Sequence, residues 1–326
     1  MKTAFLGIDV SKLSFDVALV FDEKVKCKNF TNDSRGFGAL ETWLKKQEVS
    51  ELHACMESTG IYSEALAAYL YDGKHKVSVV NPAKIKGFAQ CELARTKTDK
   101  ADAQLIARFC LKMVPELWKP KPADIKEMHQ WVNRKDSLQN MMQQERNRRE
   151  SAGKEVLERI EETIRYLGKE IDFAKSRIKQ IIANNPDLLR KQELLKSIPG
   201  VSDATIARVL SSIGETQNFS SAKEVSAFMG LNPRHKQSGT SVMGRARISK
   251  TGDSDLRKSM YMPAISAMKC NPTIKEFCEN LAKRGKSKMV IVVAAMRKLV
   301  HIIYGVLKNE KPYDPNWNHL IPVLGY

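Results

Sequence analysis

Eight apolar residues in the middle of the chain follow one another at alternating steps of three and four. This spacing places them on one side of a helix and amounts to more than three heptads of a coiled-coil seam. The seam residues are Leu157, Ile160, Ile164, Leu167, Ile171, Ala174, Ile178 and Ile181. The residues around them are too polar to be buried, so we favour an intermolecular coiled coil. A helical hairpin packed within the chain is the alternative.

A long helical segment of this kind divides the 326 residues into two folded parts. Pro115, Pro120 and Pro122 mark a linker before it, and Asn185-Pro186 follows it. We therefore predict a first domain over residues 1–122, a helical spacer over 123–186, a basic helical domain over 187–310 and an irregular tail over 311–326.

The first part alternates between strand and helix patterns. The expected strands are 4–9, 14–20, 24–30, 52–57 and 77–80, and the expected helices are 35–46, 62–71 and 99–112. Three antiparallel-looking strands followed by strand–helix units predict a mixed α/β sheet. This order is the one seen in RNase H-like folds, of which the RuvC-like domains are one group.

Four carboxylates have a special place in this pattern. Asp9 and Glu57 each end an expected strand, where ligands bind in α/β sheets. Asp99 and Asp102 are three residues apart at the start of a helix and share one face. A divalent cation removes the repulsion between such acids, and oxygen ligands select Mg²⁺ or Mn²⁺. The alternative is structural, because Thr96-x-x-Asp99 resembles a capping box and acids in a first turn favour the helix dipole.

Charge indicates the partner of the second part. The chain has a formal net charge of +17, and residues 190–310 contain 21 basic and nine acidic residues. Such a basic half usually binds a polyanion, and nucleic acid fits better than a membrane because the basic residues follow no clean amphipathic helix.

With no signal peptide and no run of 18 apolar residues, we expect a cytoplasmic protein that does not span a membrane. The six cysteines lack zinc spacing and are expected to be reduced thiols.

Two segments of the basic part have patterns typical of DNA handling. Residues 195–210 resemble a helix-hairpin-helix, in which backbone N–H groups around a Pro-Gly turn at Gly200 bind a phosphate. An ordinary turn between helices with Gly200 as the C-cap is the alternative. Residues 230–252 are too rich in Gly, Ser and Pro for a regular element and predict a loop that wraps a phosphate backbone, with a solvated basic loop as the alternative. Its basic residues are Arg234, Lys236, Arg245, Arg247 and Lys250, with Ser241 among them.

Taken together, these motifs resemble one known family over nearly the whole chain. Gly7-Ile-Asp9-Val-Ser-Lys12, Met56-Glu57-Ser-Thr-Gly60, Asn81-Pro82 and Lys97-Thr-Asp99-Lys-Ala-Asp102 resemble the DEDD (RuvC-like) domain of IS110-family insertion-sequence transposases. Ser197-Ile-Pro-Gly200, Ala227-Phe-Met-Gly230-Leu-x-Pro233, Ser238-Gly-Thr-Ser241 and Ile248-Ser-Lys-x-Gly252 resemble the family's C-terminal transposase domain.

The resemblance implies a recombinase that moves its own element through a circular DNA intermediate. An element-encoded bridge RNA would pair with donor and target DNA and choose the sites. The four metal-binding acids would be Asp9, Glu57, Asp99 and Asp102, the serine nucleophile Ser241, and the active form a dimer or tetramer.

Two other functions compete with this one. A Holliday-junction resolvase would use the same acids for hydrolysis alone, but it needs neither the basic second half nor the Ser-Gly-Thr-Ser loop. A non-enzymatic nucleic-acid-binding scaffold is the second alternative, and metal-dependent strand cleavage would exclude it.

Overall fold

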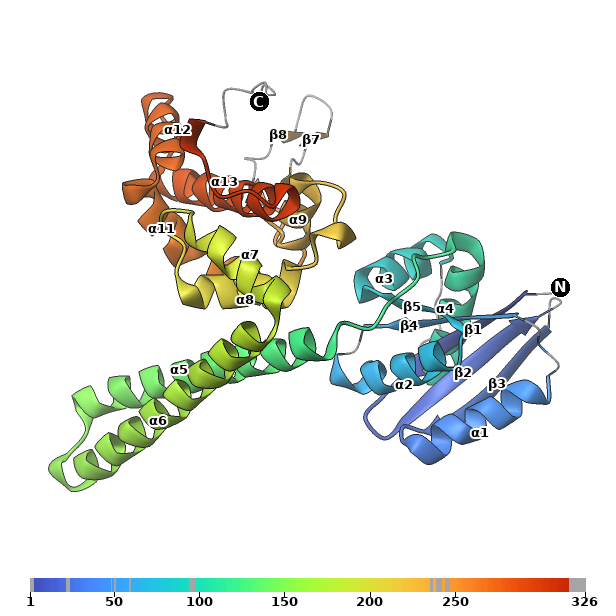
Figure 1. The fold of residues 1–326 in the computed structure, drawn as a ribbon. Helices are drawn as coiled ribbons and strands as arrows, with labels where there is room; N and C mark the ends of the chain where they lie inside the picture. Colours follow the sequence, from blue (N-terminus) through green and yellow to red (C-terminus); the bar gives the residue numbers. More distant parts are fainter. Residues whose placement is uncertain are drawn as a thin grey trace. The chain divides into compact units, whose positions relative to one another are not determined.

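The structure is a computed structural model that describes residues 3–21, 24–47, 49, 51–58, 60–93, 98–234, 237–238, 242–243 and 247–316. Two compact units divide the chain, Met1–Lys121 (unit 1) and Pro122–Tyr326 (unit 2), and each has hydrophobic clusters of its own (Figure 1). The boundary lies among the prolines of the expected linker.

Unit 1 is built on a five-stranded mixed sheet. Its strands are β1 (Thr3–Val10), β2 (Ser14–Phe21), β3 (Lys24–Thr31), β4 (Glu51–Glu57) and β5 (Lys76–Val80), in the spatial order β3-β2-β1-β4-β5. β1, β2 and β3 are antiparallel neighbours, whereas β4 runs parallel to β1 and β5 parallel to β4. The predicted mixed α/β class is confirmed, each expected strand lies within one residue of its observed bounds, and the arrangement is consistent with an RNase H-like fold.

Helices cover both faces of this sheet. The helices of unit 1 are α1 (Ser34–Lys45), α2 (Ile61–Asp72), α3 (Pro82–Cys91) and α4 (Asp99–Met113). α1 and α2 pack on one face through residues such as Leu40 and Leu66. α3 and α4 cover the other face through Ile85, Leu105 and Ile106. Burial on both faces explains why the central strands read as nearly continuous apolar runs.

Helix α3 was not expected from the sequence. Asn81-Pro82 was interpreted as the end of a strand, but it also begins a helix. The Asn81 side chain accepts a hydrogen bond from the Ala83 N–H at 2.8 Å, and Pro82 occupies the first turn, where a missing N–H costs nothing.

The segment after α4 turns back along β5. The Trp118 N–H donates to the Val77 carbonyl at 2.7 Å, and the Ser78 hydroxyl donates to the Glu116 carbonyl at 2.8 Å. The Trp118 ring packs edge-on against Tyr71. This segment therefore occupies the outer side of β5.

Unit 2 is mainly helical. Its helices are α5 (Ala123–Ser151), α6 (Lys154–Asn184), α7 (Pro186–Lys196), α8 (Asp203–Ile213), the 3₁₀ helix η1 (Thr216–Asn218), α9 (Ala222–Phe228), α10 (Ser254–Ser259), α11 (Tyr261–Cys270), α12 (Pro272–Lys283) and α13 (Lys288–Asn309). Four two-residue strands lie between α9 and α10: β6 (Pro233–Arg234), β7 (Gln237–Ser238), β8 (Val242–Met243) and β9 (Arg247–Ile248). Residues from α5 through α13 share one core, with Leu299 and Ile303 fully buried.

α13 is long and apolar enough to cross a membrane by length and composition. The central helix of a globular core passes the same test, and half of the apolar stretch is buried within unit 2. Arg297, Lys298 and His301 interrupt its apolar sequence, so the helix contains no run of 18 apolar residues.

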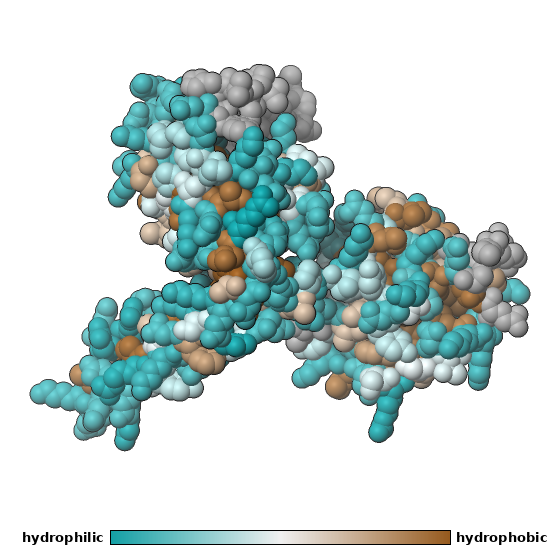
Figure 2. Space-filling model, in the orientation of Figure 1, coloured by the Kyte–Doolittle hydropathy of each residue, from teal (hydrophilic) through white to brown (hydrophobic). Residues whose placement is uncertain are grey.

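The predicted seam lies on α6, which pairs with α5 in a hairpin that extends from unit 2 (Figure 1). Five seam residues, from Leu167 to Ile181, are buried, whereas Leu157, Ile160 and Ile164 at the far end are half-buried. The intramolecular alternative therefore describes the packing of this chain. Figure 2 shows the hairpin surface as predominantly hydrophilic. Association between copies stays a prediction, and the half-buried residues Leu157, Ile160 and Ile164 are the part of the seam left to mediate it.

A buried charge network joins α5 to α8. The Arg208 guanidinium donates to Asn133 at 2.7 Å and pairs with Asp136, which also pairs with Lys135 at 2.9 Å. Arg208 and Lys135 are 5% and 7% exposed. Burial alone would raise the pKa of Asp136, but hydrogen bonds and charge from Lys135 and Arg208 outweigh it and hold this pKa below its usual value. The network fixes the base of the hairpin on the unit 2 core.

Candidate active site

Asp9 and Glu57 lie side by side at one edge of the unit 1 sheet. β1 and β4 are parallel, with Gly7 opposite Cys55 and Ile8 opposite Met56, so the next residues in register are Asp9 and Glu57. Cys55 packs on the α4 side of the sheet, and side chains two residues apart share a face. Both carboxylates are therefore placed on the face that α4 covers.

A glycine allows α4 to approach this face closely. A Cβ atom on Gly7 would lie 2.1 Å from the Ala103 carbonyl oxygen and 2.2 Å from the Ala107 nitrogen. α4 thus runs directly over β1. Phe5, earlier in β1, packs with the cluster that holds Phe109 and Cys110, later in α4. The two elements therefore run in opposite directions, and the first turn of α4 lies toward the Asp9 end of β1.

Asp99 and Asp102 occupy that first turn. The helix begins after Thr98, whose hydroxyl accepts a hydrogen bond from the Ala101 N–H at 3.2 Å. The expected cap, Thr96, lies outside the described residues, and the capping role belongs to Thr98. Asp99 is exposed and Asp102 half-buried. The backbone therefore brings all four predicted acids to one end and one face of the sheet.

Sequence reasoning missed a fifth carboxylate in this row. Asp16 lies directly opposite Asp9 in the antiparallel β1–β2 pair and accepts a hydrogen bond from the Asn29 side chain at 2.9 Å. Its signal was available, because Phe15 and Val17 are buried on the far side, so the alternation places Asp16 on the α4 face. Its charge adds to the negative potential around Asp9.

The donor chemistry of this region suits a hard divalent cation, because all of the predicted ligands are carboxylate oxygens. Among the residues that the structure describes, no three His, Cys, Asp or Glu side chains gather closely enough to hold a metal ion. The acids are therefore placed together by the backbone without forming a closed ligand cage.

Backbone hydrogen bonds hold the two ends of the basic segment of unit 2, residues 230–252, close together. The Ser249 N–H donates to the Asn232 carbonyl, and the Asp253 N–H donates to the Phe228 carbonyl at 2.8 Å. A Cβ on Gly252 would lie 2.1 Å from the same Phe228 oxygen, so this close approach requires glycine. The irregular loop that we expected thus contains two short antiparallel ladders, β6–β9 and β7–β8.

Two of the predicted phosphate-binding arginines lie opposite one another in the first ladder. Arg234 pairs with Arg247 across β6 and β9, and both are exposed. Like charges directly opposite on neighbouring strands destabilise a ladder, and an anion between them removes that cost. Lys250 is exposed beside this ladder in a left-handed conformation. Lys236, Ser241 and Arg245 lie outside the described residues.

Gly200 packs against a helix. It has a φ of 96°, and a Cβ there would lie 2.7 Å from the Ala267 nitrogen in α11. The expected Pro-Gly turn joins α7 to α8, with Ser202 capping α8. Close packing accounts for the glycine. A phosphate contact through the backbone of this turn stays a prediction.

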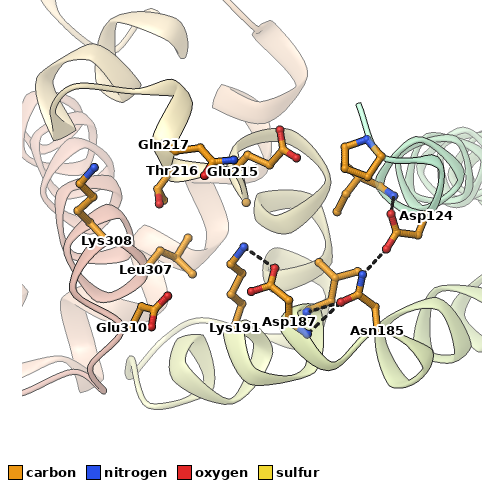
Figure 3. A pocket seen from close by; sticks show the side chains of 14 residues that line it. Asp124, Asn185, Asp187, Lys191, Glu215, Thr216, Gln217, Leu307, Lys308 and Glu310 are labelled. Atoms are coloured by element: carbon orange, nitrogen blue, oxygen red, sulfur yellow. Dashed lines mark hydrogen bonds and ion pairs between the residues drawn. The ribbon is translucent and has the colours of Figure 1, made fainter. Parts of the chain in front are cut away.

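A polar pocket of about 410 Å³ lies elsewhere in unit 2 (Figure 3). Its walls include Asp124, Asp187, Glu215 and Glu310, and Lys191 donates to Asp187 at 2.6 Å. None of the predicted site residues lines it. Four acids would repel a phosphate, so we do not assign the DNA-handling site to this pocket.

Comparison with known proteins identifies the family. Residues 6–157 match a family model described as a transposase with a DEDD domain of the IS110 type, and residues 192–279 match the IS116/IS110/IS902 transposase family. The pilin gene-inverting protein of Moraxella bovis is 34% identical over 317 residues, which cover 96% of this chain and 98% of that protein. The chain belongs to the IS110 family of transposases.

Other relatives agree with this assignment. The pilin gene-inverting protein of Moraxella lacunata is also 34% identical over the same share of both chains. A probable family 20 transposase of Pseudomonas aeruginosa is 29% identical over 163 residues, 47% of each protein. This IS110-family transposase is therefore a DNA recombination enzyme, and its DEDD domain implies the use of a divalent metal.

Proposed function

We propose that this transposase cleaves, exchanges and rejoins donor and target DNA strands at sites chosen by an element-encoded bridge RNA, with Asp9, Glu57, Asp99 and Asp102 as Mg²⁺ ligands and Ser241 as the nucleophile. The observation that carries the proposal is the convergence of the four acids on one end and one face of the unit 1 sheet. The guide RNA and the serine come from the family resemblance, and the homo-oligomer from the apolar seam of α6.

The four acids would act on the phosphodiester through the divalent ion that they hold. A bound divalent ion supplies charge neutralisation at the phosphate oxygens and at the leaving oxygen. The carboxylates themselves orient that ion. The Asn29 hydrogen bond holds Asp16 beside Asp9, which adds negative charge and strengthens the preference for a cation at this end of the sheet.

The serine step conserves the energy of the DNA backbone. The Ser241 Oγ–phosphorus bond forms as the bond from phosphorus to one deoxyribose oxygen breaks, and the proton lost by serine is balanced by the proton gained by the leaving oxygen. A hydroxyl of the new partner strand then attacks phosphorus, Oγ leaves, and a phosphodiester is restored. The arginine pair at residues 234 and 247 supports this proposal because it favours an anion near the same segment.

The main alternative is a resolvase that hydrolyses strands without a covalent intermediate. The relatives named as gene-inverting proteins favour recombination, because inversion requires each broken end to be joined to a new end. Their similarity extends over nearly the whole chain, basic unit 2 included.

A trapping experiment tests the chemistry. Wild-type protein with labelled DNA, Mg²⁺ and co-purified RNA is expected to give a denaturant-resistant protein–DNA adduct, and Ser241→Ala is expected to give none and no strand exchange. Ser238→Ala, a hydroxyl neighbour three residues away, is the matched control. Full strand exchange by Ser241→Ala with no adduct from the wild type would exclude the serine route.

Mixed oligomers test whether a site is shared between subunits. If the acids of one subunit serve the serine of another, Ser241→Ala and Asp102→Ala subunits are expected to restore activity when combined. Failure to restore activity would assign each site to a single subunit.

A further inference from the structure

One face of α13 presents two basic side chains that the core does not use. Arg297 and His301 are four residues apart and therefore lie next to each other on the helix. Both are partly exposed, while Leu299, Val300 and Ile303 on the opposite side are buried. Gly305, one further turn along, has open space where a side chain would be. The face is thus basic, and none of the described residues fills the space beside Gly305.

The polar atoms of this face lack partners. Arg297 Nε and His301 Nε2 are both inaccessible to solvent and have no hydrogen-bond partner within the described part of the chain. Leaving such donors unsatisfied costs on the order of 1–3 kcal/mol each. In native proteins most such groups are satisfied by a protein group, an ordered water or a bound ion.

The charges that shift the pKa of His301 are all positive. Burial lowers the pKa of His301 to about 4, and the charges of Arg297, Lys298 and Lys223 of α9 lower it in the same direction. Glu224, the acid next to Lys223, instead accepts hydrogen bonds from the Ser220 N–H at 2.7 Å and hydroxyl at 2.8 Å. A positive cluster with no acid among its named neighbours favours an anion.

Lys298 lies on the border of this cluster. Its ammonium group is 6.0 Å from the centre of the Phe277 ring in α12, and burial lowers its pKa. The cation–π contact holds its charge toward α12. The side chains left to contact a ligand are Lys223, Arg297 and His301.

We infer that Lys223, Arg297 and His301 form a binding site for a backbone phosphate of nucleic acid on the α9–α13 face of unit 2. Arg297 can donate from the terminal nitrogens of its guanidinium group and Lys223 from its ammonium group, which are donors that phosphate recognition uses, while His301, whose Nε2 is inaccessible to solvent, borders the site. A nucleic-acid phosphate is the anion that a transposase meets in its reaction. This site is separate in sequence from the β6–β9 arginines and from the turn at Gly200.

Salt-dependent binding tests the site without requiring catalysis, so its outcome is independent of the serine and metal proposals. Full-length protein is titrated with a labelled 30-base-pair duplex DNA and with a labelled single-stranded RNA of the same sequence, over a range of KCl concentrations. The test variant is Lys223→Gln with Arg297→Gln. We expect the slope of log K against log salt to fall by about 1–2 for the duplex, for the RNA or for both, with roughly tenfold weaker binding near 0.1 M salt.

Matched control variants show whether weaker binding comes from this site or from the loss of positive charge in general. Arg159→Gln with Lys175→Gln removes the same charge from α6, where each residue is already paired with an acid, at 2.7 and 3.0 Å. That variant is expected to bind like the wild type. Arg297→Lys keeps the charge and is expected to keep most of the slope, which a purely structural role for the guanidinium would not predict.

The result on each probe has a defined meaning. Loss on RNA alone assigns the site to the RNA backbone, loss on the duplex alone assigns it to DNA, and either supports the inference. Equal slopes for the α9–α13 variant and the α6 control on both probes would overturn it. So would equal loss by Arg297→Lys and Arg297→Gln, accompanied by a lower melting temperature.

Discussion

Substitution of Gly7 by alanine tests whether α4 positions the acidic site. The added Cβ would lie 2.1 Å from the Ala103 oxygen and 2.2 Å from the Ala107 nitrogen, and both are backbone atoms of a packed helix. Ordinary contact requires more than 3 Å, so α4 must retreat by roughly 1 Å. Overpacking of this kind typically costs about 3 kcal/mol.

The retreat moves Asp99 and Asp102 away from Asp9 and Glu57. A displacement of about 1 Å at a reacting centre costs on the order of 10²-fold in rate. We therefore expect Gly7→Ala to lower strand cleavage about 100-fold in a single-turnover assay, and the melting temperature of unit 1 by on the order of 10 °C. DNA affinity carried by unit 2 should change little.

Gly38→Ala is the control in the same unit. Gly38 lies in α1, and an added Cβ there meets no atom within 4 Å. Replacing a helical glycine by alanine stabilises by up to about 1 kcal/mol, so this variant should cleave normally and melt slightly higher. Wild-type cleavage and melting by Gly7→Ala would refute the proposed link between the β1–α4 contact and the site.

Three further predictions concern the acids, the hairpin and the buried charge network. Asp102→Ala is expected to abolish Mg²⁺-dependent strand cleavage while circular dichroism and DNA affinity stay unchanged, and normal cleavage would remove Asp102 from the site. Ile164→Asp, at the half-buried far end of α6, is expected to lower the oligomer mass in light scattering. An unchanged mass for Ile164→Asp would limit the seam to intramolecular packing. Ile171→Asp is expected to disrupt the hairpin itself, because Ile171 is 5% exposed and packs with Leu138 and Leu167. Asp136→Asn leaves Arg208 buried without its charge partner and is expected to cost about 3 kcal/mol in unfolding free energy at pH 7. Because the folded pKa of Asp136 is lowered, its stabilisation is present above the ordinary aspartate pKa of 3.8 and is lost as the pH falls through the folded pKa. Acid titrations of wild type and variant should therefore converge there.

The sequence was sufficient for the strands of unit 1 because their patterns are local. Strand alternation and apolar runs locate β1 to β5, and strand ends locate Asp9 and Glu57. Alternation in β2 was enough to place Asp16 on the α4 face, but its position opposite Asp9 depends on cross-strand register, which no local pattern in the sequence reveals.

The Asn-Pro pairs show a second reason why the sequence did not predict every element. Three helices, α3, α7 and α12, begin with asparagine as the cap and proline in the first turn, at Asn81, Asn185 and Asn271. Asn-Pro also marks turns, so the dipeptide alone does not distinguish an ending strand from a starting helix. For the seam, periodicity specified the helix but not its partner. The apolar residues of α5 that pack near it, Ile125, Met128, Val132, Leu138 and Met142, are interrupted by the buried Lys135 and so form no equally regular seam.

The segment that lies along β5 limits how the protein can assemble. An uncovered sheet edge invites pairing with another chain, and natural proteins protect such edges. The Trp118 N–H already occupies the Val77 carbonyl on one edge, and lysines at 24, 26 and 28 alternate along β3 on the other. Strand-to-strand joining of two sheets is therefore disfavoured at both edges, so the association that we propose would have to use helical surfaces or a shared nucleic acid.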